Sequence, residues 1–211
     1  MNREQVLAEV KRDGLYLEFA PAFQNDREVV MEAVQQNGEA LEFAPAFKND
    51  REVVMAAVQQ NGWALQFAPA FKNDIEVVME AVQKNGRVLA VAPTFQGDRD
   101  VVMAAVQQNG RALAYAPTLR SDPEIACAAV RNNPIALNII DPSLDKNEQF
   151  IKCMMKYNIN PGGRSELKRH ILDRQSLKTS AKTLHDTFKY GVNSFLGGRT
   201  RKQKRKRTRR R

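Results

Sequence analysis

The chain has few of the residues that enzymes commonly use for catalysis. Among 211 residues it has two histidines, His170 and His185, two cysteines, Cys127 and Cys153, and one tryptophan. The spacing of the histidines and cysteines does not match a zinc site with paired ligands. Walker-type and GxGxxG loops, GxSxG and HExxH are also absent. We therefore expect a protein that is not an enzyme, with no catalytic residue, no metal ligand and no cofactor.

The sequence also lacks a long apolar segment. No run approaches the roughly 18 apolar residues of a membrane span, and the start, MNREQVLAEVKRDG, does not resemble a signal peptide. We expect no membrane span, and a location in the cytoplasm or nucleus rather than secretion. In a reducing compartment Cys127 and Cys153 are expected to be buried thiols, not a disulfide.

What the sequence has instead is a repeat of 24 residues. Residues 26–49 are DREVVMEAVQQNGEALEFAPAFKN, and residues 50–73 differ from them at only three positions. Similar or weaker copies begin at Asn2, Asp74, Asp98 and Asp122. Six tandem repeats therefore fill residues 2–145. Degenerate end units are typical of stacked arrays, because their outer faces meet water rather than a neighbour.

The charge is divided unevenly along the chain. Residues 1–145 carry 13 basic and 20 acidic side chains, a net charge of −7, although the whole chain has +9. Residues 146–198 have a net charge of +6, and residues 199–211 have ten basic and no acidic side chains. An acidic array joined to a basic tail suggests two separate interactions on one chain.

Each unit begins with an expected α-helix. In the second unit Asp26 is a strong N-cap. One helical face carries the apolar residues Val29, Val30, Ala33 and Val34. The run ends at Asn37-Gly38, a dipeptide that also favours hairpin turns. Because it follows a helical rather than an alternating pattern, we expect Gly38 to be the left-handed residue after the helix.

The second element of the unit, EALEFA at residues 39–44, is ambiguous. A strand would give units of leucine-rich-repeat length, with Leu41 and Phe43 on one face. The absence of LxxLxLxxN spacing and of β-branched runs favours a short helix that ends before Pro45, with Phe47 anchoring the following loop. The prediction is an all-α fold, a short α-solenoid of 24-residue two-helix repeats that bury their apolar faces by stacking.

The repeated motif D-R-E-V-V-x-x-A-V-x-x-N-G-x-A-L-x-[FY]-A resembles the tandem repeats of the family catalogued as domain of unknown function 4116. In the third unit the matching positions are Asp50, Val53, Val54, Ala57, Val58, Gly62, Leu65, Phe67 and Ala68. The linker departs from the family, with Ala-Pro-Ala-Phe in place of a more acidic sequence. The resemblance covers about two thirds of the chain and implies a helical repeat array without an established activity.

Three sets of positions vary among otherwise similar units. They are Glu32, Ala56, Glu80 and Ala104; Glu39, Trp63, Arg87 and Arg111; and Glu42, Gln66, Ala90 and Ala114. If the units stack regularly, each set forms a row on the surface. The candidate partner surface comprises Trp63, Arg87, Arg111, Glu39, Glu42 and Gln66, with Trp63 as a possible anchor. The competing interpretation is drift after duplication, since scattered surface apolar residues are common.

Further segments follow the array. Residues 146–158 form a degenerate seventh half-repeat, and residues 159–164 form a Pro/Gly linker. The apolar positions of the half-repeat are Phe150, Ile151 and Met155.

Residues 165–192 are predicted to form an amphipathic helix with Ser165 as its cap. Its apolar stripe comprises Leu167, Ile171, Leu172, Leu177, Leu184 and Phe188. This helix either caps the C-terminal end of the array or meets a membrane surface or another protein. Asp173 and Asp186 interrupt its basic face and favour capping.

Residues 193–211 are predicted to form a disordered basic tail, because like charges repel and little is available to pack. Its basic residues are Arg199, Arg201, Lys202, Lys204, Arg205, Lys206, Arg207, Arg209, Arg210 and Arg211. Nuclear import, sequence-blind binding to a phosphate backbone and simple solubilisation are the alternatives. Without interleaved aromatic residues, base-specific recognition is not indicated.

The sequence LGGRTRKQKRKRTRRR that ends the chain resembles the Gly-Gly and Arg/Lys/Thr tails of many proteins of large algal DNA viruses. The resemblance implies a viral origin, and with it a location in the cytoplasm or nucleus of a host cell, or in a virion. The favoured hypothesis is a non-enzymatic scaffold whose array binds an unidentified partner protein and whose tail binds nucleic acid or another polyanion, or directs nuclear import. The alternative is a structural virion component, with the array as a spacer and the tail against genome or capsid.

Overall fold

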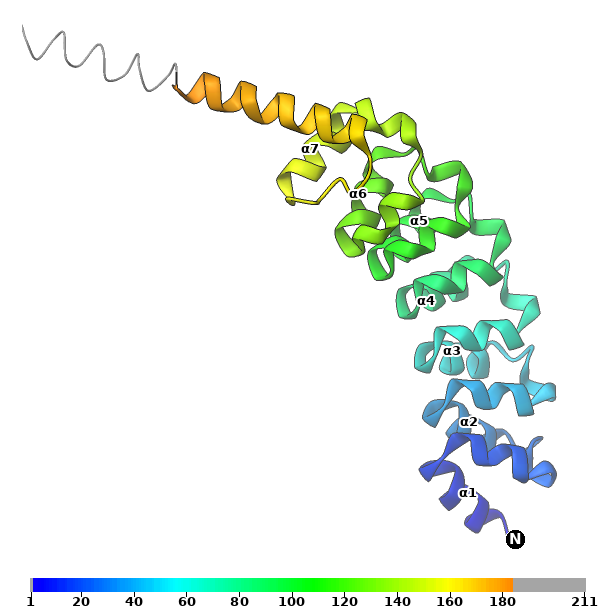
Figure 1. Cartoon of the computed structure of the whole chain (residues 1–211). Helices are drawn as coiled ribbons and strands as arrows, with labels where there is room; N and C mark the ends of the chain where they lie inside the picture. Colours follow the sequence, from blue (N-terminus) through cyan, green and yellow to red (C-terminus); the bar gives the residue numbers. More distant parts are fainter. Residues whose placement is uncertain (1, 184–211) are drawn as a thin grey trace, which may run out of the picture. The chain divides into compact units, whose positions relative to one another are not determined.

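The computed structural model describes residues 2–183 (Figure 1). The chain divides into two compact units, Met1–Pro161 and Gly162–Arg211. Throughout residues 2–183 the regular structure is helical and no strand is present. The prediction of an all-α array of 24-residue repeats is confirmed.

The first compact unit contains α-helices that follow one another in chain order, from α1 in blue to α7 in yellow (Figure 1). The first six begin 24 residues apart. These six are α1 (Arg3–Arg12), α2 (Arg27–Gln36), α3 (Arg51–Gln60), α4 (Ile75–Lys84), α5 (Arg99–Gln108) and α6 (Pro123–Asn132). The seventh, α7 (Glu148–Lys156), begins 25 residues after α6.

The start of α2 shows why these residues form a helix. The Asp26 side chain accepts hydrogen bonds from the N–H groups of Glu28 and Val29, which have no partner within the helix. The buried residues of α2 are the predicted Val29, Val30, Ala33 and Val34. Full burial of a valine stabilises a fold by roughly 1.5–3 kcal/mol, and the same face recurs in α3, α4 and α5.

A six-residue 3₁₀-helix follows most α-helices, so the prediction of a short helix rather than a strand is correct. In the second unit it is η3 (Gly38–Phe43). Its equivalents are η1 (Gly14–Phe19), η5 (Gly62–Phe67), η7 (Gly86–Val91), η9 (Gly110–Tyr115) and the five-residue η11 (Pro134–Asn138). Ala44 ends η3 with φ −117° and ψ 64°, because the residue before Pro45 is disfavoured in the α region.

Each unit has a third element where only a loop was expected. In the second unit it is the single turn η4 (Pro45–Phe47), in which proline supplies a helical φ and needs no N–H partner. Its equivalents are η2 (Pro21–Phe23), η6 (Pro69–Phe71), η8 (Pro93–Phe95), η10 (Pro117–Leu119) and η12 (Pro142–Lys146). Phe47 is half-buried, and its carbonyl accepts the N–H of Asp50, the next cap.

The predicted left-handed conformation of Gly38 is wrong. Among the described residues only Asn158 and Gly162 have positive φ. Asn37 instead takes an extended conformation, and its side chain caps η3 by accepting the N–H of Glu39. Glycine is required at position 38 because an added β-carbon would overlap the carbonyl oxygen of Ala57 in the next unit.

Stacking of the units produces two layers. Each α-helix of the array contacts the next α-helix, and each six-residue 3₁₀-helix contacts the next one. We call these the α layer and the 3₁₀ layer. The core lies between them, where the valines of the α layer meet the fully buried leucines Leu17, Leu41, Leu65, Leu89 and Leu113.

The expectation of two free thiols is wrong. Cys127 of α6 and Cys153 of α7 form a disulfide, with their Cα atoms 6.0 Å apart. Because the α-helices of successive units pack side by side, residues about one repeat apart in sequence become neighbours, and the two cysteines are 26 apart. The bond joins the last repeat of the array to the half-repeat that follows it.

Two details of the C-terminal segments also differ from expectation. In α7 the buried residues are Phe150, Ile151, Cys153 and Met154, and the predicted Met155 is only half-buried. The chain is helical from residue 165 to residue 183, so Ser165 is the first helical residue and not the cap.

The apolar stripe of this last helix is shorter than expected. Leu167 and Ile171 are buried, whereas Leu172 and Leu177 are 53% and 69% exposed. Leu184, Phe188 and the basic tail lie outside the described residues. No helix within residues 2–183 is long and apolar enough to cross a membrane.

Candidate interaction surfaces

The three variable sets of positions lie on two different layers. Glu32, Ala56, Glu80 and Ala104 belong to the α layer. The sets that contain Trp63 and Gln66 belong to the 3₁₀ layer, where they occupy the second and fifth residues of successive 3₁₀-helices. Because these elements stack in order, members of one set lie on consecutive units.

The set Glu39, Trp63, Arg87 and Arg111 is called here the 3₁₀ row. Trp63 is half-buried, and the other three are exposed. The Glu39 carboxylate accepts a hydrogen bond of 3.2 Å from Asn61 of the next unit. Within residues 2–183, the guanidinium groups of Arg87 and Arg111 and the indole N–H have no hydrogen-bond or ion-pair partner. The row therefore presents one aromatic ring and two unpaired cations.

The second set on this layer has polar side chains in the earlier units and alanines in the later ones. Glu42 and Gln66 are exposed, Ala90 is half-buried and Ala114 is exposed. Beside Gln66, the ammonium of Lys48 lies 5.9 Å from the ring centre of Phe67, a contact between adjacent units. Such cation–π contacts at exposed sites are weak, so this contact adds little to the stability of the layer.

The N-terminal ends of the α-helices carry a ladder of ion pairs between units. Arg3 reaches the Asp26 carboxylate at 2.6 Å and the Glu28 carboxylate at 2.7 Å. The same two-pronged contact joins Arg27 to Asp50 and Glu52, Arg51 to Asp74 and Glu76, and Arg99 to Asp122 and Glu124. Each arginine holds the cap residue and the first turn of the next helix.

These contacts change the titration of the cap carboxylates. The hydrogen bond from Arg3 lowers the pKa of Asp26 below its ordinary value, and partial desolvation opposes it. Arg51 lowers the pKa of Asp74 in the same way. The ionised form of these caps is thus the form that the folded array prefers.

The opposite ends of the helices are joined by side-chain amides. Oε1 of Gln60 accepts the N–H of Gly38 at 2.6 Å, while its Nε2 donates to the carbonyl of Gln36 at 3.0 Å. Gln108 and Asn132 repeat this bridge to the units before them. Lys84 occupies the equivalent place in α4, and an ammonium cannot accept the N–H of Gly62. That junction therefore lacks the bridge.

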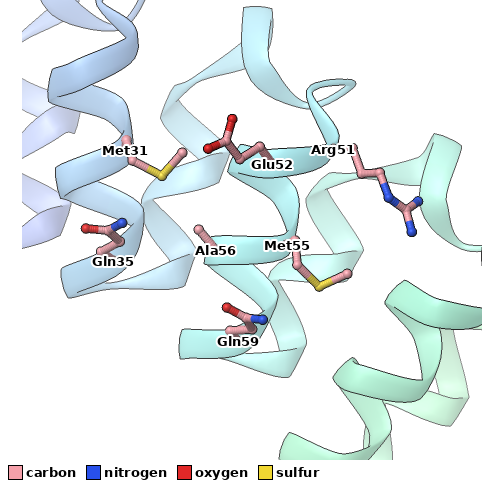
Figure 2. A pocket seen from close by; sticks show the side chains of 7 residues that line it. All are labelled: Met31, Gln35, Arg51, Glu52, Met55, Ala56 and Gln59. Atoms are coloured by element: carbon pink, nitrogen blue, oxygen red, sulfur yellow. The ribbon is translucent and has the colours of Figure 1, made fainter.

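On the surface of the α layer, the sixth and seventh residues of each unit meet across the junctions. The pairing is seen directly at the end of the array, where Cys127 and Cys153 occupy these two positions and are bonded. Figure 2 shows the equivalent positions at the α2–α3 junction, with the Met31 side chain directed from α2 toward α3, which carries Glu52 and Ala56.

The α2–α3 junction contains a hollow of about 450 Å³. It is lined by Met31, Gln35, Arg51, Glu52, Met55, Ala56 and Gln59. Figure 2 shows the short side chain of Ala56 in the middle, the two glutamines toward the C-terminal ends of the helices, and Arg51 directed away toward α4. The hollow is thus lined by the methionine side chains and the methyl group of Ala56, with polar side chains at its edges.

Comparison with known families agrees with the repeat pattern. The family model described as Domain of unknown function (DUF4116) matches residues 2–48, 37–70, 50–96 and 98–145. The chain belongs to this family. Matches to residues 2–48, 50–96 and 98–145 each extend over two 24-residue units, so one DUF4116 match corresponds to a stacked pair. No curated protein and no solved structure matches the chain.

The DUF4116 array offers few groups for chemistry. Within residues 2–183 no cluster of histidine, cysteine or carboxylate side chains has the composition of a metal site. Most cap aspartates are engaged by their own helix and by an arginine. The basic residues 199–211, which were predicted to bind polyanions, lie outside the described part of the chain.

Sequence reasoning missed the contacts that set the register of the DUF4116 units. The ion-pair ladder joins residues 23 and 25 apart, such as Arg3 to Asp26 and Glu28. The disulfide joins residues 26 apart. All three separations lie within two residues of the 24-residue repeat, so a search at these spacings would have found the ion pairs and the disulfide.

Proposed function

We propose that the array is a non-enzymatic scaffold that binds a partner protein through the 3₁₀ row, with Trp63 as its anchor. The observation that carries this proposal is the half-buried indole of Trp63 on the unit next to Arg87 and two units from Arg111, both without ion-pair partners in the described residues. Tryptophan and arginine contribute disproportionately to binding energy at protein interfaces.

The ladder on the α layer provides a contrast that supports this assignment. There Arg3, Arg27, Arg51 and Arg99 are each engaged by two carboxylates. Arg87 and Arg111 stabilise nothing comparable within the array, although the array has excess acidic groups. A partner carboxylate would complete their hydrogen bonds, and an arginine fork suits bidentate recognition of carboxylates.

A matched pair of variants tests the proposal. Trp63→Glu copies the residue of the preceding unit, Glu39, so it leaves the fold intact. Glu42→Gln copies Gln66 and changes one charge on the same layer. Quantitative affinity capture from the producing cells should show a partner that Trp63→Glu loses by about tenfold or more and that Glu42→Gln retains. Equal capture by both variants would indicate that the differences along the 3₁₀ row arose by drift after duplication and serve no partner.

The basic tail supplies the second part of the proposal. Ten basic residues in 199–211 favour low-specificity binding to nucleic acid or another polyanion, or nuclear import. The test compares the salt dependence of nucleic-acid affinity for the full chain and for a chain that ends at Gly198. A steep dependence that truncation removes supports tail binding, because each neutralised phosphate contributes about −0.7 to −0.9 to the log–log slope. If the full chain does not bind nucleic acid, nuclear import and solubilisation remain as the roles of the tail.

A second candidate is a structural virion component, with the array as a spacer and the tail against genome or capsid. The resemblance of the tail to those of large algal DNA virus proteins favours it. The Cys127–Cys153 disulfide also suits a particle or another oxidising environment better than the cytoplasm or nucleus, where thiols stay reduced. A spacer would assemble unchanged with Trp63→Glu, whereas a scaffold would lose its partner.

A further inference from the structure

A second binding surface follows from the junctions of the α layer. At the α6–α7 junction the Cys127–Cys153 bond joins the sixth residue of one unit to the seventh of the next, counted from the caps Asp122 and Asn147. We extend this pairing to the earlier junctions, whose caps are 24 residues apart. The facing pairs before it are Leu7 and Glu32, Met31 and Ala56, Met55 and Glu80, Met79 and Ala104, and Met103 and Ala128. The junctions therefore differ mainly in whether the second residue is glutamate or alanine.

Glutamate and alanine have opposite effects on the space between neighbouring helices. Glu80 is half-buried, with 29% of its side chain exposed, so it occupies part of the α3–α4 junction. Ala56 leaves the same place empty at the α2–α3 junction, and the hollow of about 450 Å³ lies there. The short side chain of Ala56 thus contributes to the hollow, because a glutamate at this position would extend into it.

The lining of the hollow favours an apolar group with polar surroundings. Met31 and Met55 are half-buried, and methionine is flexible and polarisable, so it adapts to different apolar partners. The amides of Gln35 and Gln59 are exposed at the rim. Glu52 lies at the other edge with 73% of its side chain exposed. A small isolated ligand would be poorly enclosed in so open a space, whereas one side chain of a larger partner would fill it.

We infer that this hollow receives an apolar side chain of an amphipathic, basic helix from a partner protein. The basic character follows from charge complementarity, since residues 1–145 carry a net charge of −7. Such a helix would place its apolar residue between Met31 and Ala56, and a lysine or arginine of the helix would share the exposed Glu52 carboxylate with Arg27. This is helix-in-groove recognition, in which apolar anchors set affinity and flanking charges set orientation. The surface lies on the α layer and is independent of the 3₁₀ row.

The test uses the full chain labelled at the methionine methyl groups and a short synthetic leucine–lysine peptide that forms an amphipathic helix. NMR titration should shift the Met31 methyl signal and leave that of Met154, which is buried in α7, unchanged. A scrambled peptide of the same composition, which cannot present an apolar face, should leave Met31 unshifted.

The deciding variant is Ala56→Glu. It copies Glu32 and Glu80, so the fold tolerates it, and it fills the hollow while adding a negative charge. Electrostatics alone predicts tighter binding of the basic peptide, whereas a filled hollow predicts weaker binding. We expect roughly tenfold weaker binding and loss of the Met31 shift. Ala8→Glu adds the same charge at the equivalent position of α1, the first α-helix within residues 2–183, where Ala8 is exposed, and it should not weaken binding.

Three results would overturn this inference. They are unchanged or tighter binding by Ala56→Glu, an equal response to the scrambled peptide, and a Met31 signal that does not shift. Trp63→Glu is the control that separates this surface from the proposed scaffold function. It should leave peptide binding unaffected, so the two proposals can fail separately.

Discussion

Ile75 lies where an arginine would be expected to reach the carboxylate of Asp98. At four other junctions an arginine in this position bridges the cap aspartate and the acidic residue of the next first turn. Ile75 is 46% exposed, and no arginine contacts Asp98 among the described residues. Asp98 is accordingly exposed, whereas the cap aspartates with arginine partners are half-buried.

We predict that Ile75→Arg completes the ladder and stabilises the array slightly. Exposed ion pairs contribute little, so the rise in the thermal midpoint should not exceed about 3 °C and should shrink at high salt. Ile75→Gln removes the exposed apolar group without adding a guanidinium and serves as the control. A comparable and salt-independent rise with Ile75→Gln would show that the exposed isoleucine, not the missing ion pair, was responsible.

The close approach of units at Gly38 gives a larger effect. Gly38→Ala forces a β-carbon into the carbonyl of Ala57 and should destabilise the array by about 2–3 kcal/mol in urea denaturation. Gly97→Ala is the matched control, because its nearest neighbour would be the Thr118 hydroxyl at 4.0 Å. If both substitutions had the same small effect, the stacking geometry described here would be wrong.

Reduction of the disulfide should loosen the C-terminal end of the array. Breaking the Cys127–Cys153 bond, which joins residues 26 apart, is expected to lower the stability of α7 by about 2–4 kcal/mol. Hydrogen exchange of the α7 amides with and without dithiothreitol measures this. The Cys127→Ala/Cys153→Ala variant should be insensitive to the reductant. Two titratable thiols in the purified, non-reduced protein would contradict the bond.

Acid should weaken the contacts between units. The pKa values of Asp26 and Asp74 are lowered in the folded array by their arginines, so their contribution is present above the unfolded pKa of about 3.9 and is lost as the pH falls through the lower folded value. In urea denaturation measured from pH 6 to pH 2, the midpoint concentration of urea should therefore stay nearly constant down to about pH 4 and decrease at lower pH. Arg51→Gln should make that fall shallower, and an unchanged profile would argue against the ladder.

The periodicity of the sequence was sufficient to predict the repeat architecture but not the backbone conformation of the turns. Asp26 and the valines of α2 identify the helix, because capping and burial act within one unit. Asn37-Gly38 misled, because the reason for the glycine lies in the next unit, at the carbonyl of Ala57. A local rule for helix ends cannot detect a steric requirement imposed by a neighbour 19 residues further on.

The candidate surfaces were predictable to different degrees. Variation among the units identified Trp63 and Arg87, because repeats allow one position to be compared several times within a single chain. The hollow beside Ala56 was not foreseen, because its shape depends on which residues face each other across a junction. The disulfide was missed for the same reason and because a reducing compartment was assumed.

The central claim, that the 3₁₀ row binds a partner protein, is tested most directly by photo-crosslinking in the producing cells. A photoreactive phenylalanine analogue is placed at position 63 in one chain and at position 46, an exposed site in the turn η4, in another. The account predicts a discrete protein adduct at position 63 that is absent at position 46. The same adducts at both positions, or none at position 63, would contradict it.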